Sequence, residues 1–455
     1  MKKDRNRRFV HTRYVDEAGA WYALDNAGII MPPVSNSVNT SLFRLEMRLD
    51  APVDREIMGR ALAETARRFS YFNVRLRRGF FWYYFEQRKN PPRLYEDSIY
   101  PSQDWNINRR GSRLIRVRVH GNRIALECSH ALSDGSGALS FLKTLVTRYF
   151  ALQGIEPGAE LGVAPFEDIL PTDRLPSSEE CEDGYQRYLL QGCPSPEREP
   201  KAWHIESERL PVGQYRMTIG TLPLGDTLAA AKERGASLTE FLAAVYLYSL
   251  QAIWRAQHSD AVGKSPGKRP EQRLLSLEIP VNLRKFFPSK TNRNFSLYIL
   301  LKEDMGLGFR DLDELIMRTH CQMKLGNDSK SIQRQISRNA RSARNMAVRI
   351  VPLALKDIFA RMIYASFGET TLSGFLSNVG VVSLPPAIAP HVEGINFFPA
   401  PSTCTLTNAS VISWNDTLSI CFGSLAKSRE LERLFFTTLR GLGIPVAVRC
   451  REQEE

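Results

Sequence analysis

A histidine and an aspartate stand four residues apart in the run His130-Ala131-Leu132-Ser133-Asp134-Gly135. A neutral imidazole is a competent base near neutral pH, so His130 could take the proton of an alcohol, amine or thiol that attacks an acyl carbonyl. Residues 121–129 open as a turn and then alternate like a strand, whereas residues 136–150 have helical apolar spacing. We therefore expect His130 at the end of a strand and Asp134 at the start of a helix.

Two roles are open to Asp134. It could orient the imidazole, as the aspartate of a serine protease triad does. Alternatively, it could cap the helix or pair with a distant arginine and so hold the loop in shape. Because the loop is short, we expect its side chain to point away from the ring of His130, which favours the structural role. Gly135 would then let backbone pass closely, beside a substrate or the facing lobe.

Other catalytic signatures are absent from the sequence. Cys128 and Ser129 flank His130, but neighbours on a strand point to opposite faces, so neither is expected to serve the imidazole as a nucleophile. No Gly-x-Ser-x-Gly elbow, Walker loop or dinucleotide glycine motif is present. The seven cysteines form no CxxC pair, and no two histidines have metal-ligand spacing. We therefore expect no metal and a reducing, cytoplasmic environment.

The length and composition predict two lobes. A chain of 455 residues exceeds what one hydrophobic core usually fills. The basic N-terminal run, residues 1–8, is followed by no apolar segment of the kind a signal peptide needs. No stretch reaches the roughly 18 uncharged apolar residues of a membrane span. The sequence thus predicts a soluble protein without a membrane span.

The net charge of +12 has three interpretations. A solvated basic surface is the ordinary one. Nucleic acid binding is disfavoured because no known recognition module is present. A polyanionic partner, such as the diphosphate of coenzyme A or an acidic carrier protein, would also suit the charge.

The order of patterns along the chain predicts an α/β or α+β protein in two halves. Strands and helices alternate twice, and the Pro-, Gly- and acid-rich stretch 152–205 separates the halves. We place an N-terminal lobe at 1–175, a linker at 176–205 and a C-terminal lobe at 206–455. Ser237 and Glu240 predict a capping box at the start of a helix. A helix over 428–442 is expected to close the chain.

These motifs resemble the acyltransferase superfamily with the chloramphenicol acetyltransferase fold, closest to its alcohol acetyltransferase and condensation-domain branches. His130 to Gly135 matches its His-x-x-x-Asp-Gly signature, and 279–284 with 294–296 resemble its Pro-Val-Asn-Leu-Arg and Gly-Asn-Phe elements. Residues 376–380 (Leu-Ser-Asn-Val-Gly) and 24–27 (Leu-Asp-Asn-Ala) are similar to alcohol acetyltransferase-like members. The four elements cover nearly the whole chain in the same order.

This sequence departs from the family at three points. Ser129 stands where condensation domains usually have a second histidine, which favours the acyltransferase branches. Arg293 replaces the glycine of the Gly-Asn-Phe element, so the turn is expected to differ there. The Asp-Phe-Gly-Trp-Gly segment of condensation domains and plant acyltransferases is absent.

The resemblance implies two lobes in a V-shaped pseudo-dimer, each with a mixed sheet and helices, and a channel between them with His130 near its middle. It implies that Arg284 pairs with Asp134, and that Ser377 or Asn378, or a nearby backbone N–H, donates to the oxyanion. A turn held by the Ser377 and Asn378 side chains themselves is the alternative.

The leading functional prediction is an O-acyltransferase that moves an acyl group, such as acetyl, from acyl-CoA to an alcohol, with His130 as general base. The first alternative is a free-standing condensation enzyme that uses carrier-protein thioesters with an amine or alcohol acceptor. The second is a catalytically silent binding module of the same fold. We expect no permanently bound cofactor, an acyl-CoA or acyl-carrier thioester as co-substrate, no nucleic acid partner, and a monomer.

Overall fold

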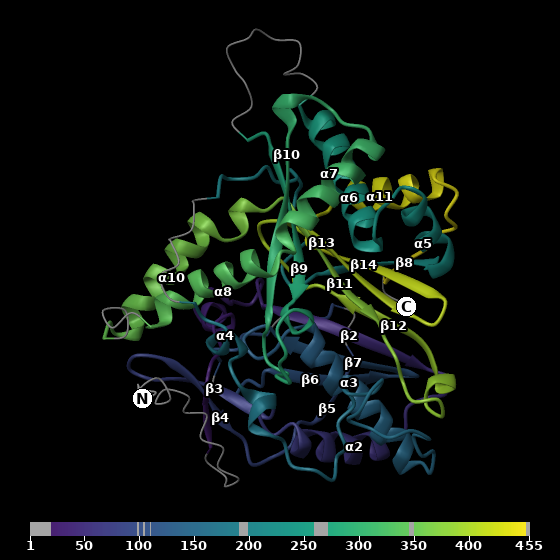
Figure 1. The fold of residues 1–455 in the computed structure, drawn as a ribbon. Coiled ribbons are helices and arrows are strands. Elements are labelled where there is room, and N and C mark those ends of the chain that lie inside the picture. Colours follow the sequence, from purple (N-terminus) through teal and green to yellow (C-terminus); the bar gives the residue numbers. More distant parts are fainter. Residues whose placement is uncertain are drawn as a thin grey trace, which may run out of the picture.

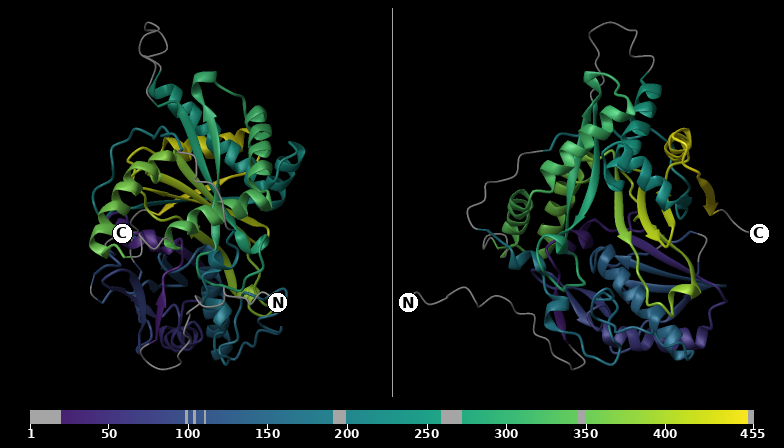
Figure 2. Two further views of the ribbon diagram at one scale, coloured as in Figure 1. Left: turned by 60° about the vertical axis from the view of Figure 1, so that its left-hand side comes forward. Right: turned by 45° about the vertical axis from the view of Figure 1, so that its right-hand side comes forward.

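The polypeptide forms two lobes, each built on a mixed β-sheet (Figure 1). The computed structural model describes residues 20–97, 100–102, 105–109, 111–190, 199–258, 272–344 and 350–451. The basic run at residues 1–8 lies outside these ranges. In both views of Figure 2 the N-terminal lobe, purple to blue, lies beneath the teal-to-yellow C-terminal lobe. The predicted two-lobed α/β fold is confirmed.

The N-terminal lobe contains a five-stranded sheet in the order β12-β2-β7-β6-β5. Its strands pair antiparallel except for β5 and β6, which run parallel. A separate antiparallel sheet has the order β1-β4-β3. The strands are β1 (Trp21–Ala23), β2 (Leu42–Leu49), β3 (Val74–Arg78), β4 (Tyr83–Gln87), β5 (Leu94–Glu96), β6 (Ile115–His120), β7 (Arg123–Ser129) and β12 (Val392–Phe398).

The C-terminal lobe contains a seven-stranded sheet in the order β10-β9-β11-β13-β14-β8-β15. Strand β11 runs parallel to both of its neighbours, and the other pairs are antiparallel. The strands are β8 (Arg216–Pro223), β9 (Leu274–Asn282), β10 (Ser296–Asp304), β11 (Gly374–Val381), β13 (Thr407–Trp414), β14 (Thr417–Ser424) and β15 (Ala447–Arg451).

Helices cover both sheets and bury the two main cores. Apolar side chains of α2 and α3 pack with β2, β6 and β7, whereas α6, α7 and α11 pack on the seven-stranded sheet. The helices are α1 (Met31–Val34), α2 (Arg55–Arg68), α3 (Gly135–Leu152), α4 (Gly184–Arg187), α5 (Leu224–Glu233), α6 (Leu238–Gln257), α7 (Leu312–Gly326), α8 (Ser329–Arg344), α10 (Leu353–Phe367) and α11 (Glu430–Gly441).

Capping side chains set the starts of α2 and α6. The Asp54 carboxylate accepts hydrogen bonds from the backbone N–H groups of Glu56 and Ile57 and so caps α2. Ser237 and Glu240 form the predicted capping box at the start of α6. Among the described residues, no single helix is long and apolar enough to cross a membrane.

One strand crosses between the lobes, so a contiguous division at residue 206 does not describe the sheets. We expected 206–455 to form the C-terminal lobe alone. Strand β12 instead pairs antiparallel with β2 of the N-terminal sheet, and its Ile395 and Phe397 join the N-terminal core. Figure 2 shows this yellow-green strand reaching into the lower lobe. By pairing with β2, strand β12 becomes the edge strand of the five-stranded sheet and connects the two lobes.

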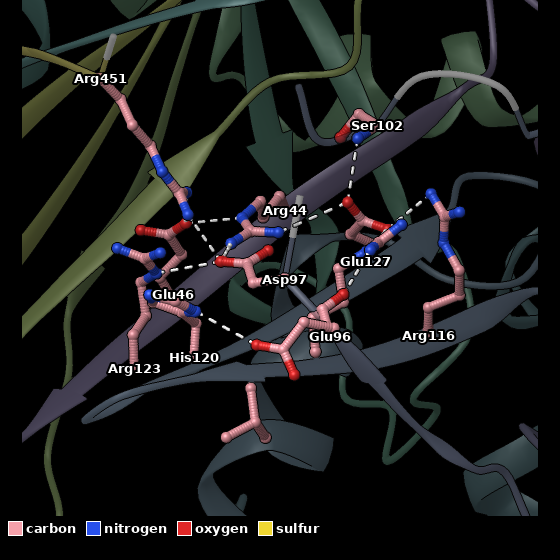
Figure 3. Close-up of polar contacts among 12 residues, drawn as sticks. Arg44, Glu46, Glu96, Asp97, Ser102, Arg116, His120, Arg123, Glu127 and Arg451 are labelled. Atoms are coloured by element: carbon pink, nitrogen blue, oxygen red, sulfur yellow. Dashed lines mark hydrogen bonds and ion pairs between the residues drawn. The ribbon is translucent and has the colours of Figure 1, made fainter. Parts of the chain in front are cut away.

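A second connection between the lobes is made by Arg451. The helix expected to close the chain is followed by strand β15, whose last residue, Arg451, reaches the N-terminal lobe. Its guanidinium contacts Glu46 at 2.7 Å and Asp97 at 2.6 Å (Figure 3). These carboxylates belong to a buried ionic network made of Glu46, Asp97, Glu127, Arg44, Arg116, Arg118, Arg123 and Arg451. The sequence patterns did not predict this network.

Candidate active site

The His130–Gly135 loop joins β7 to α3, as the sequence predicts. The His130 N–H donates to the Ser41 carbonyl at 2.9 Å, which continues the pairing of β7 with β2 by one residue. A turn then places the Leu132 N–H on the Ser129 carbonyl at 2.8 Å, and Asp134 is the N-cap of α3. The loop therefore has a strand behind it and a helix in front of it, both of which limit its movement.

The ring of His130 is half-buried and packs against Phe43, with 4.5 Å between the ring centroids. Burial lowers the pKa of His130 to about 4, because it disfavours the imidazolium, and the charge of Asp134 opposes this shift. The imidazole is therefore neutral at physiological pH. Within the described part of the chain its ring nitrogens make no hydrogen bond, so they are available to a substrate proton.

The Asp134 carboxylate points away from His130 and into the protein. One oxygen accepts from the Gly137 N–H at 3.0 Å, and the other accepts from the Phe295 N–H at 2.9 Å and from Arg284 Nη1 at 2.8 Å. The carboxylate is nearly buried, and these three donors, two from the second lobe, occupy both of its oxygens. Asp134 has the contacts of a structural residue that joins the lobes.

Arg284 extends this contact into the second lobe. Its Nε donates to the Thr291 carbonyl at 2.8 Å and its Nη2 donates to the Arg293 carbonyl at 2.6 Å. The guanidinium thus spans the loop between β9 and β10 while it holds Asp134. Because Arg presents several donors in one plane, a single side chain can fix both the aspartate and the loop.

A second buried group supports the histidine from its backbone side. The Asn294 amide donates to the His130 carbonyl at 2.9 Å and to the Asp25 carboxylate at 3.0 Å. Asp25 is fully buried, and burial raises its pKa while the nearby Arg293 lowers it. Both residues lie in segments that resemble family elements, but that resemblance assigns neither of them a role. Only the fold brings them together.

Arg293, at the position where the resemblance leads one to expect glycine, is also buried. Its Nη1 donates to the Ala23 carbonyl at 2.7 Å, and its Nε lies 3.4 Å from the Asp25 carboxylate. The guanidinium also lies over the ring of Phe85, 5.4 Å from its centroid. The substitution therefore anchors strand β1 to the second lobe.

The close backbone contact predicted at Gly135 occurs two residues later. A Cβ on Gly135 would meet Phe397 at 3.6 Å and Val379 at 3.9 Å, which are ordinary contacts. A Cβ on Gly137 would overlap the Asn292 carbonyl oxygen of the second lobe. Gly135 therefore faces side chains, including Val379 of the C-terminal sheet, at ordinary distances, and the tightest backbone approach lies two residues later at Gly137.

Ser377 and Asn378 differ in how they lie on β11. The Asn378 amide donates to Thr239 Oγ1 at 2.9 Å, and its oxygen accepts from the Gly380 N–H at 2.9 Å. Gly380 follows a bulge and has φ of +93°, which suits glycine. Asn378 therefore holds the local backbone, which is the alternative that the sequence left open. The Ser377 hydroxyl makes no hydrogen bond to any described residue.

Cys128 and Ser129 are not presented as nucleophiles. Cys128 is fully buried, and burial raises the pKa of its thiol well above the ordinary value. The Ser129 hydroxyl accepts from the Ala131 N–H at 3.2 Å and lies 3.4 Å from the Ser41 hydroxyl. The described residues include no group of three or more His, Cys, Asp or Glu side chains placed to hold a metal ion.

A cavity of about 600 Å³ lies between the lobes. His130 is not one of its lining residues. Hydrogen bonds link it to the wall indirectly, because the Ser35 hydroxyl lies 2.9 Å from that of Ser41, whose carbonyl accepts from the His130 N–H. Cys404 Sγ in the same wall lies 3.1 Å from His204 Nε2. The residues that line the cavity are Pro33, Val34, Ser35, Asn36, Asn39, Arg361, Tyr364, Thr370, Thr403 and Cys404.

A second hollow, of about 440 Å³, is strongly basic. Arg75 and Arg77 share Glu86, whose pKa these guanidinium groups lower to about 2, whereas Arg109 is exposed. Asn108 in this hollow donates to the Pro32 carbonyl at 2.8 Å, next to the wall of the first cavity. The residues that line it are Arg75, Leu76, Arg77, Arg78, Tyr84, Glu86, Asn108, Arg109, Gly111 and Ser112.

Solved structures resemble this fold over more than nine-tenths of the chain, although no family model and no curated protein matches the sequence. Polyketide synthase associated protein 5 from Mycobacterium tuberculosis is 15% identical, with a TM-score of 0.57 over 92% of this chain and 96% of that chain. The starter condensation domain of rhizomide synthetase, solved with C8-CoA, is 14% identical, with a TM-score of 0.57 over 93% and 94%.

A third similar structure is the epimerization domain from the third module of tyrocidine synthetase B. It is 12% identical, with a TM-score of 0.53 over 93% of this chain and 97% of that chain. At these identities the likeness defines the fold alone. The chain has the condensation-domain fold, which is the chloramphenicol acetyltransferase-like fold that the motifs predict.

Proposed function

We propose that this protein is an acyltransferase that moves an acyl group from a coenzyme A thioester to an alcohol. One observation carries the proposal. His130 is neutral and half-buried, and its ring nitrogens form no hydrogen bond with any residue in the described part of the chain. The loop that carries it is held by the Asp134–Arg284 ion pair. A rigidly held base that is unprotonated at neutral pH is what proton removal from an attacking hydroxyl requires.

The reaction would proceed with the residues in these roles. A ring nitrogen of His130 takes the hydroxyl proton while the alcohol oxygen bonds to the thioester carbonyl carbon. The tetrahedral intermediate then breaks its carbon–sulfur bond, and the imidazolium returns the proton to the leaving thiolate. The products are the ester and free coenzyme A. The negative charge of Asp134 favours the transient imidazolium without a direct hydrogen bond.

Ser377 is our candidate for the oxyanion donor. Ser377 and Val379 are two residues apart on β11, and Val379 packs against the N-terminal core beside Gly135. The hydroxyl of Ser377 is half-buried and is not used by another described residue. Asn378 is not part of this proposal, because its amide holds Thr239 and Gly380.

The two hollows suit the two ends of such a donor. The inter-lobe cavity can take the acyl-pantetheine arm, and the basic hollow beside it can take the phosphates of coenzyme A. The rhizomide synthetase domain, which shares this fold, has been solved with C8-CoA. Cys404 in the cavity wall offers a probe of this assignment, because bound acyl-CoA should slow its alkylation.

The deciding experiment is thiol release from acyl-CoA in the presence of a panel of alcohols. His130→Ala should abolish the release and leave the melting curve nearly unchanged. His120→Ala is a matched control, because His120 is exposed at the end of β6 and its ring contacts the equally exposed Glu96. Full activity of His130→Ala would exclude the general-base role.

A carrier-protein thioester is the second candidate donor. The net charge of +12 and the basic hollow would suit an acidic carrier protein, and similar structures are condensation domains. Activity with acyl-CoA alone, undiminished without a carrier, would count against this donor.

Binding of both donors without turnover would instead support a catalytically silent binding module. Light scattering would test the proposed monomer.

A further inference from the structure

Helix α10 presents its apolar side chains to solvent. Its residues 355, 358, 359, 362 and 363 follow the spacing of one helical face. All five are large apolar side chains that are about half exposed: Leu355, Ile358, Phe359, Met362 and Ile363. A surface helix of a globular protein normally turns such a face toward the core. Here the face is turned outward.

Polar contacts hold the helix in this orientation. Asp357 is 3% exposed, and its carboxylate accepts from Tyr83 Oη at 2.9 Å and pairs with Arg78 at 2.9 Å. Arg361 Nε donates to the Pro33 carbonyl at 2.8 Å. Turning the apolar face inward would break these contacts, so its exposure is built into the fold.

The turn between β3 and β4 enlarges the apolar face. The Phe80 carbonyl accepts from the Leu353 N–H at 2.8 Å, and the ring of Phe80 packs against that of Phe81. Together with Ile350 and the five residues of α10, they make up what we call the apolar flank. It holds eight of the 21 large apolar side chains that are exposed in the described part of the chain. Such a concentration marks an interaction site.

The charges around the apolar flank are positive. Arg78 has 57% of its side chain exposed, Arg361 is exposed, and Lys356 lies beside Trp82. The one acid on α10, Asp357, is buried and paired. Helix α8, which Figures 1 and 2 show on the same side of the molecule, has five basic residues and no acid in its sequence.

We propose that the apolar flank docks this protein on an anionic lipid surface. Phenylalanine, leucine, isoleucine and methionine side chains on one helix face enter the boundary between headgroups and acyl chains, and basic neighbours attract anionic headgroups. The charge disfavours a second copy as the occupant, because a symmetric dimer would bring like charges together. Arg361 and Tyr364 of the same helix line the inter-lobe cavity, so docking would place that cavity next to the bilayer.

This proposal does not depend on the proposed acyl transfer, because its readout is lipid binding. The full-length protein is sedimented with vesicles of phosphatidylcholine alone and with vesicles that also contain phosphatidylglycerol. We expect binding to the anionic vesicles that weakens as salt is raised. The double variant Ile358→Ser/Phe359→Ser should bind at least about tenfold more weakly, since it removes two large inserted side chains.

The matched control is Met317→Ser/Leu325→Ser, which changes two exposed apolar residues on α7. It should bind vesicles as the unchanged protein does, and melting curves should show that both variants are folded. Failure to bind either kind of vesicle, or equal binding by both double variants, would overturn the proposal. A concentration-dependent dimer that only Ile358→Ser/Phe359→Ser dissolves would overturn it as well, in favour of a second copy.

Discussion

Asp134 and Arg284 lie 150 residues apart in the sequence and form a 2.8 Å ion pair between the two lobes. The same aspartate oxygen accepts from the Phe295 N–H, and the same guanidinium holds the loop that carries Asn294. Asn294 in turn holds the His130 carbonyl. The two residues of the motif thus have separate surroundings: Asp134 is bound to the second lobe, and His130 lies on the loop that this ion pair holds in place.

We expect Asp134→Asn to act mainly on stability. Asparagine can still cap α3, so the variant removes chiefly the charge that faces Arg284, and it leaves that guanidinium partly buried and unpaired. The free energy of unfolding should fall by about 2–4 kcal/mol in denaturant titrations. Adding Arg284→Met should recover part of this loss. An activity loss at unchanged stability would point to a direct catalytic role instead.

The depressed pKa of His130 predicts a pH dependence of folding. The pKa is about 4 in the folded protein and about 6.5 in the unfolded chain, so the unfolded state binds more protons between these values. His130 therefore contributes a loss of stability as pH falls from about 6.5 to about 4. Unfolding titrations at pH 7 and pH 5 should show a smaller drop for His130→Gln. An equal drop would contradict the shift.

Two glycines in the first turn of α3 should respond differently to alanine. Gly137→Ala places a methyl group against the Asn292 carbonyl and should lower the free energy of unfolding by about 1–3 kcal/mol. Gly135→Ala meets only ordinary contacts, so its stability should change much less. Thermal melting of the two variants side by side measures the difference. Similar melting temperatures would mean that the lobes do not meet at Gly137 as described.

The ion pairs of Arg451 should contribute measurably to the free energy of unfolding. Arg451→Ala removes one of several cations from the buried carboxylates Glu46 and Asp97, and we expect a loss of about 1–3 kcal/mol. Nearby arginines hold the pKa of Asp97 well below its usual range, so its contribution is present above pH 4 and is lost as pH falls below it. Arg433→Ala, at an exposed ion pair, is the control and should change little.

The basic hollow should recognise phosphate groups. Arg109→Gln should raise the KM for acyl-CoA by roughly three- to tenfold, because a charge-assisted contact to phosphate is lost. The KM for the matching acyl-pantetheine, which lacks those phosphates, should not change. Arg433→Gln serves as the control, because Arg433 lies on α11 and is not one of the residues that line the hollow. An equal effect on both donors would remove the hollow from the binding site.

The sequence determined those features that depend on neighbours along the chain. The strand–turn–helix setting of His130, the capping of α2 and α6, and the two-lobed fold class follow from periodicity, capping residues and four ordered motifs. Side-chain direction along a short loop also sufficed to separate Asp134 from the ring of His130.

Only the tertiary structure decided what depends on distant contacts. Three such contacts join segments far apart in the chain. Strand β12 pairs with β2, and Arg451 binds Glu46 of the N-terminal lobe. Asn294 donates hydrogen bonds to both Asp25 and the His130 carbonyl. The close approach fell at Gly137 because the facing backbone, not the motif, sets that position. Helix α10 shows the same limit: its apolar spacing predicts a helix, but the buried contacts of Asp357 decide which face meets solvent.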